Sequence, residues 1–238
     1  MHNLERYQEI VRSFATLCDQ RIRVYEELLT KVQPALASQR AQDDLRPPNF
    51  NIFFALGHAY REVATHSAIL AHLLDPAASH GQGTRFLSSF LKTLQRAADE
   101  QRKSFRLPQP DNRTRYKWNC RREVPLPDLG QADIVLRGPG LLLIIENKIY
   151  AGDQENQLLR YWRYVKDNAT LPVLVYLTPD GRRPTAYSVG DDPELNEKLI
   201  TLSYHGDVCK FIQETVTDLQ AVSVAEVLRQ YLAVVQRL

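Results

Sequence analysis

The sequence of 238 residues has only three cysteines, and they lie far apart, at Cys18, Cys120 and Cys209. None of them belongs to a Cys-x-x-Cys pair, so a zinc site built on cysteine is not expected. Cysteines without an evident pairing are typical of a protein that is kept in a reducing compartment.

Long apolar runs are also missing. The longest are far shorter than the roughly 20 residues that a membrane-spanning helix needs. The N-terminus, Met1-His2-Asn3-Leu4-Glu5-Arg6, lacks the apolar core of a signal peptide. Together with the cysteine pattern, these absences predict a cytoplasmic protein without a membrane segment.

Three common catalytic signatures are absent from the chain. There is no Gly-x-Ser-x-Gly nucleophile elbow, no Gly-x-x-x-x-Gly-Lys phosphate loop and no His-Glu-x-x-His metal motif. The formal net charge of +2 is nearly neutral and indicates no partner by itself. The chemistry must therefore be sought in another pattern.

That pattern is in residues 141–148, which read Leu-Leu-Leu-Ile-Ile-Glu-Asn-Lys. Five large apolar residues in a row predict a strand that is buried on both faces. Glu146 and Lys148 follow at its far end and, being two residues apart, point to the same face. A Glu-x-Lys pair alone is usually a solvated or salt-bridged strand edge. At the end of an apolar strand, burial of this pair costs free energy unless both side chains have partners. This cost favours a functional site.

A second short strand precedes this one. Residues 132–136 are rich in β-branched and aliphatic side chains, and Arg137-Gly138-Pro139-Gly140 predicts a turn. If the hairpin closes tightly, Leu136 lies opposite Leu141. The two strands then form an antiparallel pair whose register decides which side chains meet.

In that register Asp133 lies opposite Ile144, on the face that also carries Glu146 and Lys148. Asp133 and Glu146 become diagonal neighbours, with Cβ atoms about 7–8 Å apart or less. Two carboxylates at that separation can share one divalent cation. A bulge or a slip by one residue would send Asp133 to the opposite face, so the expected site depends on the register.

Asp133, followed thirteen positions later by Glu146-Asn147-Lys148, resembles the PD-(D/E)xK nuclease superfamily, which has the restriction-endonuclease-like fold. Ala132 stands where the name of the motif has proline. The likeness covers about residues 49–205 and extends to a branch of bacterial PD-(D/E)xK nucleases. Further segments similar to that branch are Phe50–Phe53, Glu62, His66–Pro76, His80–Gly83, Phe86–Leu87 and Gln154–Tyr161.

The chemistry of such a site follows from its residue types. Phosphodiester hydrolysis needs a nucleophilic water and a stabilised, highly charged transition state. A hard cation held by carboxylate oxygens supplies both, and Mg²⁺ (or Mn²⁺) suits few protein ligands plus water and phosphate. We expect Asp133 and Glu146 as side-chain ligands and the backbone carbonyl of Asn147 as a third. Lys148 would position the water, lower its pKa or neutralise the phosphate.

The resemblance adds two more site residues. Gln157, on a helix expected from Asp153 to Val165, would flank the metal and hold water or substrate; the alternative is an ordinary polar position. Glu62, on a helix expected over about residues 52–74, would reach the metal as a further ligand; the alternative is a surface glutamate. Glu123, at the start of the first core strand, could be a ligand or an exposed strand charge.

A basic segment precedes the first strand. Between Arg96 and Arg122 there are nine basic and only three acidic residues, with Tyr116 and Trp118 interleaved. Such a segment suits a phosphate backbone, and a solvated loop is an equal alternative. His66 and His80 could also contact phosphate, although a histidine on an apolar helix face is more often a core residue.

The N-terminal part differs in character. Apolar residues recur at steps of three and four from Leu4 to Val32 and predict one long amphipathic helix that ends near Pro34, with room for a second short helix. Asp43–Pro48 resembles a linker, so we expect a helical extension at 1–46 and a nuclease domain at 47–238. The helix could cover the core, pair with a second copy or bind a partner protein; intramolecular packing is the default.

Two more strands are expected at Leu171–Thr178 and Leu199–Tyr204, and helices within residues 206–238. This order predicts an α/β protein with a restriction-endonuclease-like α/β/α core and a mixed central sheet. The expected function is a metal-dependent nuclease that cleaves DNA rather than RNA, in bacterial defence or restriction as the resemblance implies. The alternatives are a nucleic-acid-binding or regulatory module that does not cleave, and a nuclease subunit activated by a partner.

Overall fold

A computed structural model describes residues 2–45 and 50–238 of the chain. The chain divides into two compact units, residues 1–51 and residues 52–238, and each is described by itself. The predicted domain boundary, between residues 46 and 47, lies outside the described residues.

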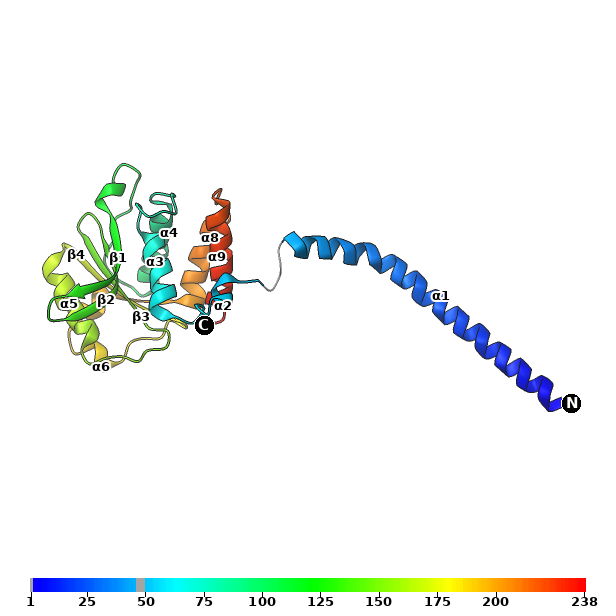
Figure 1. Ribbon diagram of the computed structural model, residues 1–238. Helices are drawn as coiled ribbons and strands as arrows, with labels where there is room; N and C mark the ends of the chain where they lie inside the picture. The colour runs from blue at the N-terminus through cyan, green and yellow to red at the C-terminus, as the bar shows by residue number, and fades with distance from the viewer. Residues whose placement is uncertain (1, 46–49) are drawn as a thin grey trace. The chain divides into compact units, whose positions relative to one another are not determined.

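The first unit is built on one long helix, α1 (His2–Leu45), which Figure 1 shows without a break. The prediction that this helix ends near Pro34 is wrong, because Pro34 lies inside it. Proline removes one backbone hydrogen bond and bends a helix, but the alanine-rich residues 35–41 that follow are strong helix formers. The start of the expected linker, Asp43, is therefore helical.

The second unit is organised around a mixed sheet of five strands in the order β1-β2-β3-β4-β5. β1, β2 and β3 are antiparallel neighbours, whereas β3, β4 and β5 run parallel. The strands are β1 (Asn119–Leu126), β2 (Gly130–Arg137), β3 (Leu141–Asn147), β4 (Leu171–Thr178) and β5 (Leu199–Ser203). This confirms the α/β class and the mixed central sheet.

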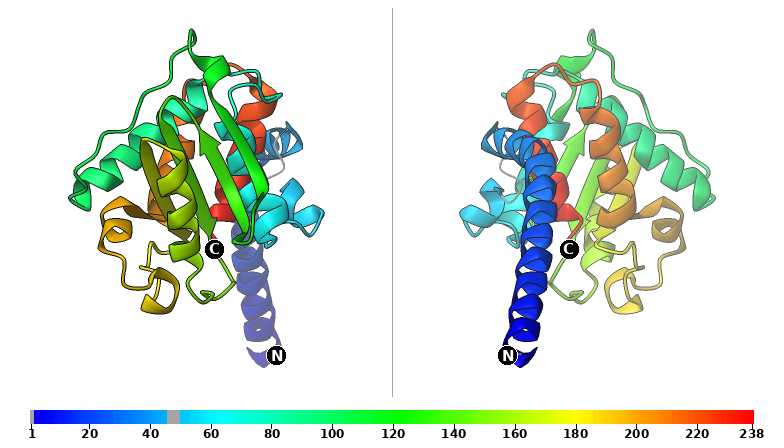
Figure 2. Two further views of the ribbon diagram at one scale, coloured as in Figure 1. Left: turned by 90° about the vertical axis from the view of Figure 1, so that its left-hand side faces the viewer. Right: turned by 90° about the vertical axis from the view of Figure 1, so that its right-hand side faces the viewer.

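Helices cover both faces of the sheet (Figures 1 and 2). One face packs against α5 (Gln157–Asn168), α6 (Ala186–Val189) and α7 (Pro193–Lys198). The other carries the larger core, made with α3 (Ala68–Leu74), α4 (Arg85–Glu100), α8 (Cys209–Val216) and α9 (Val222–Val235). The short elements are α2 (Ile52–Ala55), the π-helices η1 (Glu62–Ser67) and η3 (Tyr204–Val208), and the 3₁₀ turn η2 (Arg115–Lys117). β3 is buried on both faces, as its apolar run predicted.

The β2–β3 hairpin is tighter than the sequence predicted. Leu136 pairs with Leu143, not with Leu141, so the expected register is wrong by two residues. Two residues are also the side-chain period of a strand, and the shift therefore leaves every side chain on its predicted face. Asp133 consequently stays on the face of Glu146.

The turn residues explain the shift. Gly138 and Leu141 exchange two backbone hydrogen bonds, of 3.0 and 3.1 Å, so only Pro139 and Gly140 form the loop. Gly140 has φ +72°, which glycine adopts without a steric cost. A Cβ added to Gly138 would lie 2.3 Å from the ring of Trp118, so this glycine permits the buried indole to pack on the hairpin.

Two expected helices have different limits. The helix expected over residues 52–74 is interrupted: α2 ends at Ala55, and helical structure resumes only at Glu62. The helix expected from Asp153 begins four residues later, at Gln157. The Asp153 carboxylate does not cap it, because it accepts hydrogen bonds from Tyr176 Oη at 2.6 Å and from Thr185.

Candidate active site

The centre of the candidate site is the buried carboxylate of Glu146, at the end of β3. The residue is 2% exposed, and its Oε1 lies 2.8 Å from Lys148 Nζ and accepts a hydrogen bond of 2.7 Å from Gln157 Nε2. Lys148 and Gln157 are buried as well. The predicted pairing of Glu146 with Lys148 on one face is therefore present in the structure, and α5 adds the amide.

Asp133 on β2 lies beside this group. The β2–β3 pairing ends at Ile134 and Ile145, which directly adjoin Asp133 and Glu146 in their strands. Asp133 is half-buried, and its Oδ2 accepts a hydrogen bond of 2.8 Å from the backbone N–H of Asn147. Asp133 therefore contacts the residue that follows Glu146, and its negative charge acts on the Glu146 carboxyl.

Burial raises the pKa of both carboxyl groups. The pKa of Glu146 rises to about 8, first because of desolvation and then because of the negative charge of Asp133, against the opposing effect of Lys148. The pKa of Asp133 rises to about 6 through desolvation, against the Asn147 hydrogen bond and the Lys148 charge. One lysine therefore does not compensate both carboxylates, and an additional positive charge would favour their ionised forms.

The residues present fit a divalent cation. Glu146 Oε2 is buried and has no hydrogen-bond partner in the described part of the chain. Carboxylate oxygens are the ligands that Mg²⁺ and Mn²⁺ prefer. Among the described residues, no group of three or more His, Cys, Asp or Glu side chains is placed to hold a metal ion. Asp133 and Glu146 would supply side-chain oxygens to such a cation, with a backbone carbonyl and water as further ligands.

Glu62, expected as a further ligand, has one carboxylate oxygen bound to the backbone beside the site. Its Oε2 accepts hydrogen bonds of 2.9 Å from the backbone N–H groups of Ile149 and Tyr150, directly after the Glu146–Lys148 segment. Its negative charge also acts on the Asp133 carboxyl and raises the pKa of that group. The structure thus places Glu62 next to the site, holding the chain that leaves β3.

Two residues outside the predicted site set also hold the site. Ser67 Oγ accepts a hydrogen bond of 3.1 Å from Asn147 Nδ2, and both residues are fully buried. Tyr161 Oη accepts from Gln157 Nε2 at 3.2 Å and donates to the carbonyl of Gln131 at 2.6 Å. Tyr161 lies four residues after Gln157, so the helical period was a signal for the second contact; no sequence signal linked Ser67 to Asn147.

The remaining candidates make other contacts, although the charge of Glu123 acts on the Asp133 carboxyl and raises its pKa. Glu123 has φ +53° in β1 and accepts a hydrogen bond of 2.7 Å from Gln131 Nε2. His66 is a core residue, with ring nitrogens 3.0 Å from Tyr231 Oη and from the carbonyl of Ala59. His80 is also bound to the backbone, with Nε2 3.0 Å from the carbonyl of Asp75.

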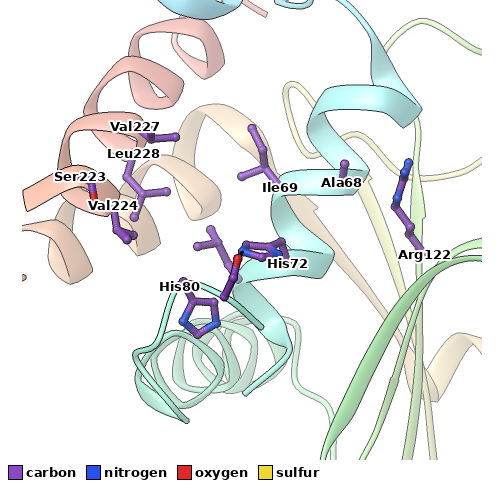
Figure 3. A pocket seen from close by; sticks show the side chains of 11 residues that line it. Ala68, Ile69, His72, His80, Arg122, Ser223, Val224, Val227 and Leu228 are labelled. Atoms are coloured by element: carbon purple, nitrogen blue, oxygen red, sulfur yellow. Dashed lines mark hydrogen bonds between the residues drawn. The ribbon is translucent and has the colours of Figure 1, made fainter. Parts of the chain in front are cut away.

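A separate pocket of about 590 Å³ lies against α3 and α9, on the side of the larger core (Figure 3). Its lining is mostly apolar, with His72, His80 and Arg122 among the polar residues. His80 lines it, whereas none of the predicted metal ligands or catalytic residues does. Arg121 does not line this pocket, unlike its neighbour Arg122. It pairs with Val135 of β2, whose side chain packs on the α5 face of the sheet. Arg121 therefore points to the face that carries Asp133 and Glu146.

Several other members of the basic segment are exposed and take part in no ion pair within the described residues: Arg113, Arg115, Lys117, Arg121 and Arg122. Arg96 and Arg106 are paired with Glu214 and Asp99. In the described part of the chain, no helix combines the length and the apolarity that crossing a membrane requires.

Comparison with protein-family models matches residues 50–233 to the PD-(D/E)XK nuclease superfamily. The match covers more than three quarters of the chain and includes every residue of the candidate site. Comparisons with curated proteins and with solved structures gave no significant match.

Proposed function

Because the chain belongs to the PD-(D/E)XK nuclease superfamily, we propose that it is a metal-dependent nuclease that hydrolyses phosphodiester bonds in DNA. One observation carries the proposal. The buried carboxylate of Glu146 shares one oxygen with a lysine and a glutamine, while its other oxygen, beside a second carboxylate, has no hydrogen-bond partner among residues 2–45 and 50–238. This arrangement is costly for folding and is suited to bind a divalent cation and a phosphate.

Each residue has a definite task in this proposal. Asp133 and Glu146 hold Mg²⁺ or Mn²⁺, together with the backbone carbonyl of Asn147. The bound cation supplies charge stabilisation and makes a water more acidic. Lys148 offers its ammonium group to the scissile phosphate or the attacking water, and Gln157 keeps the Glu146 carboxylate oriented.

Glu62 and the basic segment have supporting tasks. Glu62 fixes the backbone after Lys148 and acts as a positioning residue. Arg121 is on the face of the carboxylates and suits a contact with the nucleic-acid backbone. The choice of DNA follows from the likeness to restriction endonucleases, and a role in bacterial defence or restriction follows from the same likeness.

The test is a cleavage assay on plasmid DNA, single-stranded DNA and RNA, with Mg²⁺, with Mn²⁺ and with EDTA. Wild type is expected to cut DNA only with a metal. Asp133→Asn and Lys148→Ala are expected to lower the rate on the order of 100-fold or more, because each removes a charged group from the reacting centre. Asn retains an oxygen that can accept the Asn147 hydrogen bond, so this variant should still fold.

Asp167→Asn and Lys210→Ala are matched controls, since both residues are exposed and lie outside the site. They should leave the cleavage rate unchanged. If wild type binds nucleic acid but cuts none of the substrates with either metal, the nuclease proposal fails and a non-cleaving binding module replaces it. If RNA is cut and DNA is not, only the substrate assignment fails.

A further inference from the structure

Helix α1 has a wide apolar face that nothing within its own unit covers. Its large apolar side chains between residues 7 and 36 are each between 46% and 72% exposed. They are Tyr7, Ile10, Val11, Phe14, Leu17, Ile22, Val24, Tyr25, Leu28, Leu29, Val32 and Leu36. A helix of this kind is stabilised mainly by packing its apolar face, because isolated helices are only marginally stable in water.

The apolar side chains follow a heptad pattern. With Val11 as position a, the a positions are Val11, Cys18, Tyr25 and Val32. The d positions are Tyr7, Phe14, Arg21, Leu28 and Ala35. Eight of these nine residues are apolar or cysteine, which is the seam of a coiled coil.

The charged residues avoid this seam. Of the twelve charged residues from Arg6 to Asp44, nine occupy the outer positions b, c and f. Pro34 is also at an outer position, c, so the bend it introduces does not interrupt the seam. The helix therefore has one face for water and one face for another helix.

We infer that the face of α1 binds the α1 helix of a second copy of the chain, parallel and in register. The exposed area supports this. If one large apolar side chain has a surface of about 150–250 Å², twelve such side chains that are about half exposed present roughly 1,000 Å² per helix. A stable interface needs about 800 Å² per partner. The inference does not depend on the nuclease activity.

The flanks of the seam favour the parallel direction. In a parallel pair, each g position faces the e position five residues later on the other helix. Here Leu17 would face Ile22 and Val24 would face Leu29, and one pair, Lys31 with Leu36, would be mixed. In an antiparallel pair centred on the same seam, g faces g and e faces e, which gives two mixed pairs, Ile10 with Lys31 and Gln8 with Leu29.

Arg21 is the single charged residue in the seam. Its long side chain can extend past the flank to water, as arginine does at apolar surfaces. A lone polar residue in a core position lowers the stability of a coiled coil and fixes its register. Replacing Arg21 by leucine should therefore strengthen the association.

The first test measures the mass of the full-length protein by analytical ultracentrifugation without nucleic acid. We expect twice the chain mass of 27.3 kDa. Leu28→Asp should weaken the association on the order of 100-fold, since a carboxylate would be buried in the seam. Thr30→Asp, on the outer face two residues away, should leave it unchanged, and Arg21→Leu should tighten it about 10-fold.

The second test uses Cys18, which is exposed in the chain while Cys120 and Cys209 are buried. As an a residue, Cys18 would face Cys18 of the second copy, so mild oxidation should link the copies by a disulfide. The matched control combines Cys18→Ser with Thr16→Cys at an outer f position, and should not cross-link. A monomer at about 50 μM, or an assembly larger than two copies, would overturn the inference. A dimer that Cys18 does not cross-link would overturn the parallel register.

Discussion

His66 is expected to make the protein lose stability as the pH falls below 6.5. The side chain is fully buried, with its ring nitrogens bound to Tyr231 Oη and to the carbonyl of Ala59. Burial lowers the pKa of the imidazole from 6.5 to about 4, against the Ala59 hydrogen bond and the charge of Glu62. The aromatic ring of Tyr204 also packs on it, and no cation in the described surroundings offsets the burial.

The sign follows from proton linkage. The unfolded chain binds a proton at this imidazole near pH 6.5, whereas the folded protein binds it only near pH 4. The contribution of neutral His66 to stability is therefore complete above pH 6.5 and is lost as the pH falls towards 4. The difference between the two pKa values corresponds to about 3 kcal/mol, of which about 2.5 kcal/mol is lost at pH 4.5.

The assay compares wild type with His66→Gln by urea unfolding at pH 7.5 and pH 4.5, without added metal. At pH 7.5 the variant should be less stable by about 1–2 kcal/mol, because its hydrogen bonds to Tyr231 and Ala59 are altered. Between the two pH values wild type should lose about 2.5 kcal/mol more than the variant. The carboxylates of the site titrate equally in both proteins, so their effect cancels in the comparison.

His205→Gln is the matched control, since His205 is an exposed histidine in η3. It should keep the pH dependence of wild type. If the free-energy difference between wild type and His66→Gln is the same at both pH values within about 0.5 kcal/mol, the imidazole is not held neutral in the fold and the reasoning is refuted.

Two further outcomes are expected. Ser67→Ala should slow cleavage by roughly 10-fold, because Asn147 Nδ2 loses its partner and the backbone beside Asp133 is less well held; Ser104→Ala, at an exposed position, should not. An unchanged rate in Ser67→Ala would contradict the positioning role. Gly138→Ala should destabilise the protein by about 1–3 kcal/mol in thermal or urea unfolding, because a Cβ would lie 2.3 Å from the Trp118 ring, whereas Gly152→Ala, with nothing within 4 Å, should be neutral.

The sequence predicted the strands well because their signals are local. The apolar run of β3 and the Pro139-Gly140 turn specify a buried strand and a hairpin without reference to the rest of the chain. The face of Asp133 was also predictable, even from a wrong register, since an error of two residues preserves the side-chain direction.

The interrupted helices could not be predicted in this way. Asp153 is a good capping residue, but its carboxylate is bound to Tyr176 and Thr185, which are distant in the sequence. Glu62 lay on an apolar stripe that continued through a predicted helix, and nothing local indicated that its carboxylate would bind the backbone after β3. Tertiary hydrogen bonds of this kind override local propensity.

The π-helix η1 explains how one helical turn can contact the end of β3 through two of its side chains. In an α-helix, residues five apart point about 140° away from each other, because each residue turns by about 100°. In η1 the backbone N–H of His66 bonds to the carbonyl of Arg61, five residues back. This wider turn brings residues five apart onto the same side.

Glu62 and Ser67 are separated by five residues, and both contact the end of β3: Ser67 at Asn147, and Glu62 at Ile149 and Tyr150. An α-helical turn would direct only one of them there. His66 points to Tyr231 of α9, so the C-terminal helix is connected to the same turn. The irregular helix is therefore the element that joins the core packing of α9 to the backbone beside Asp133, Glu146 and Lys148.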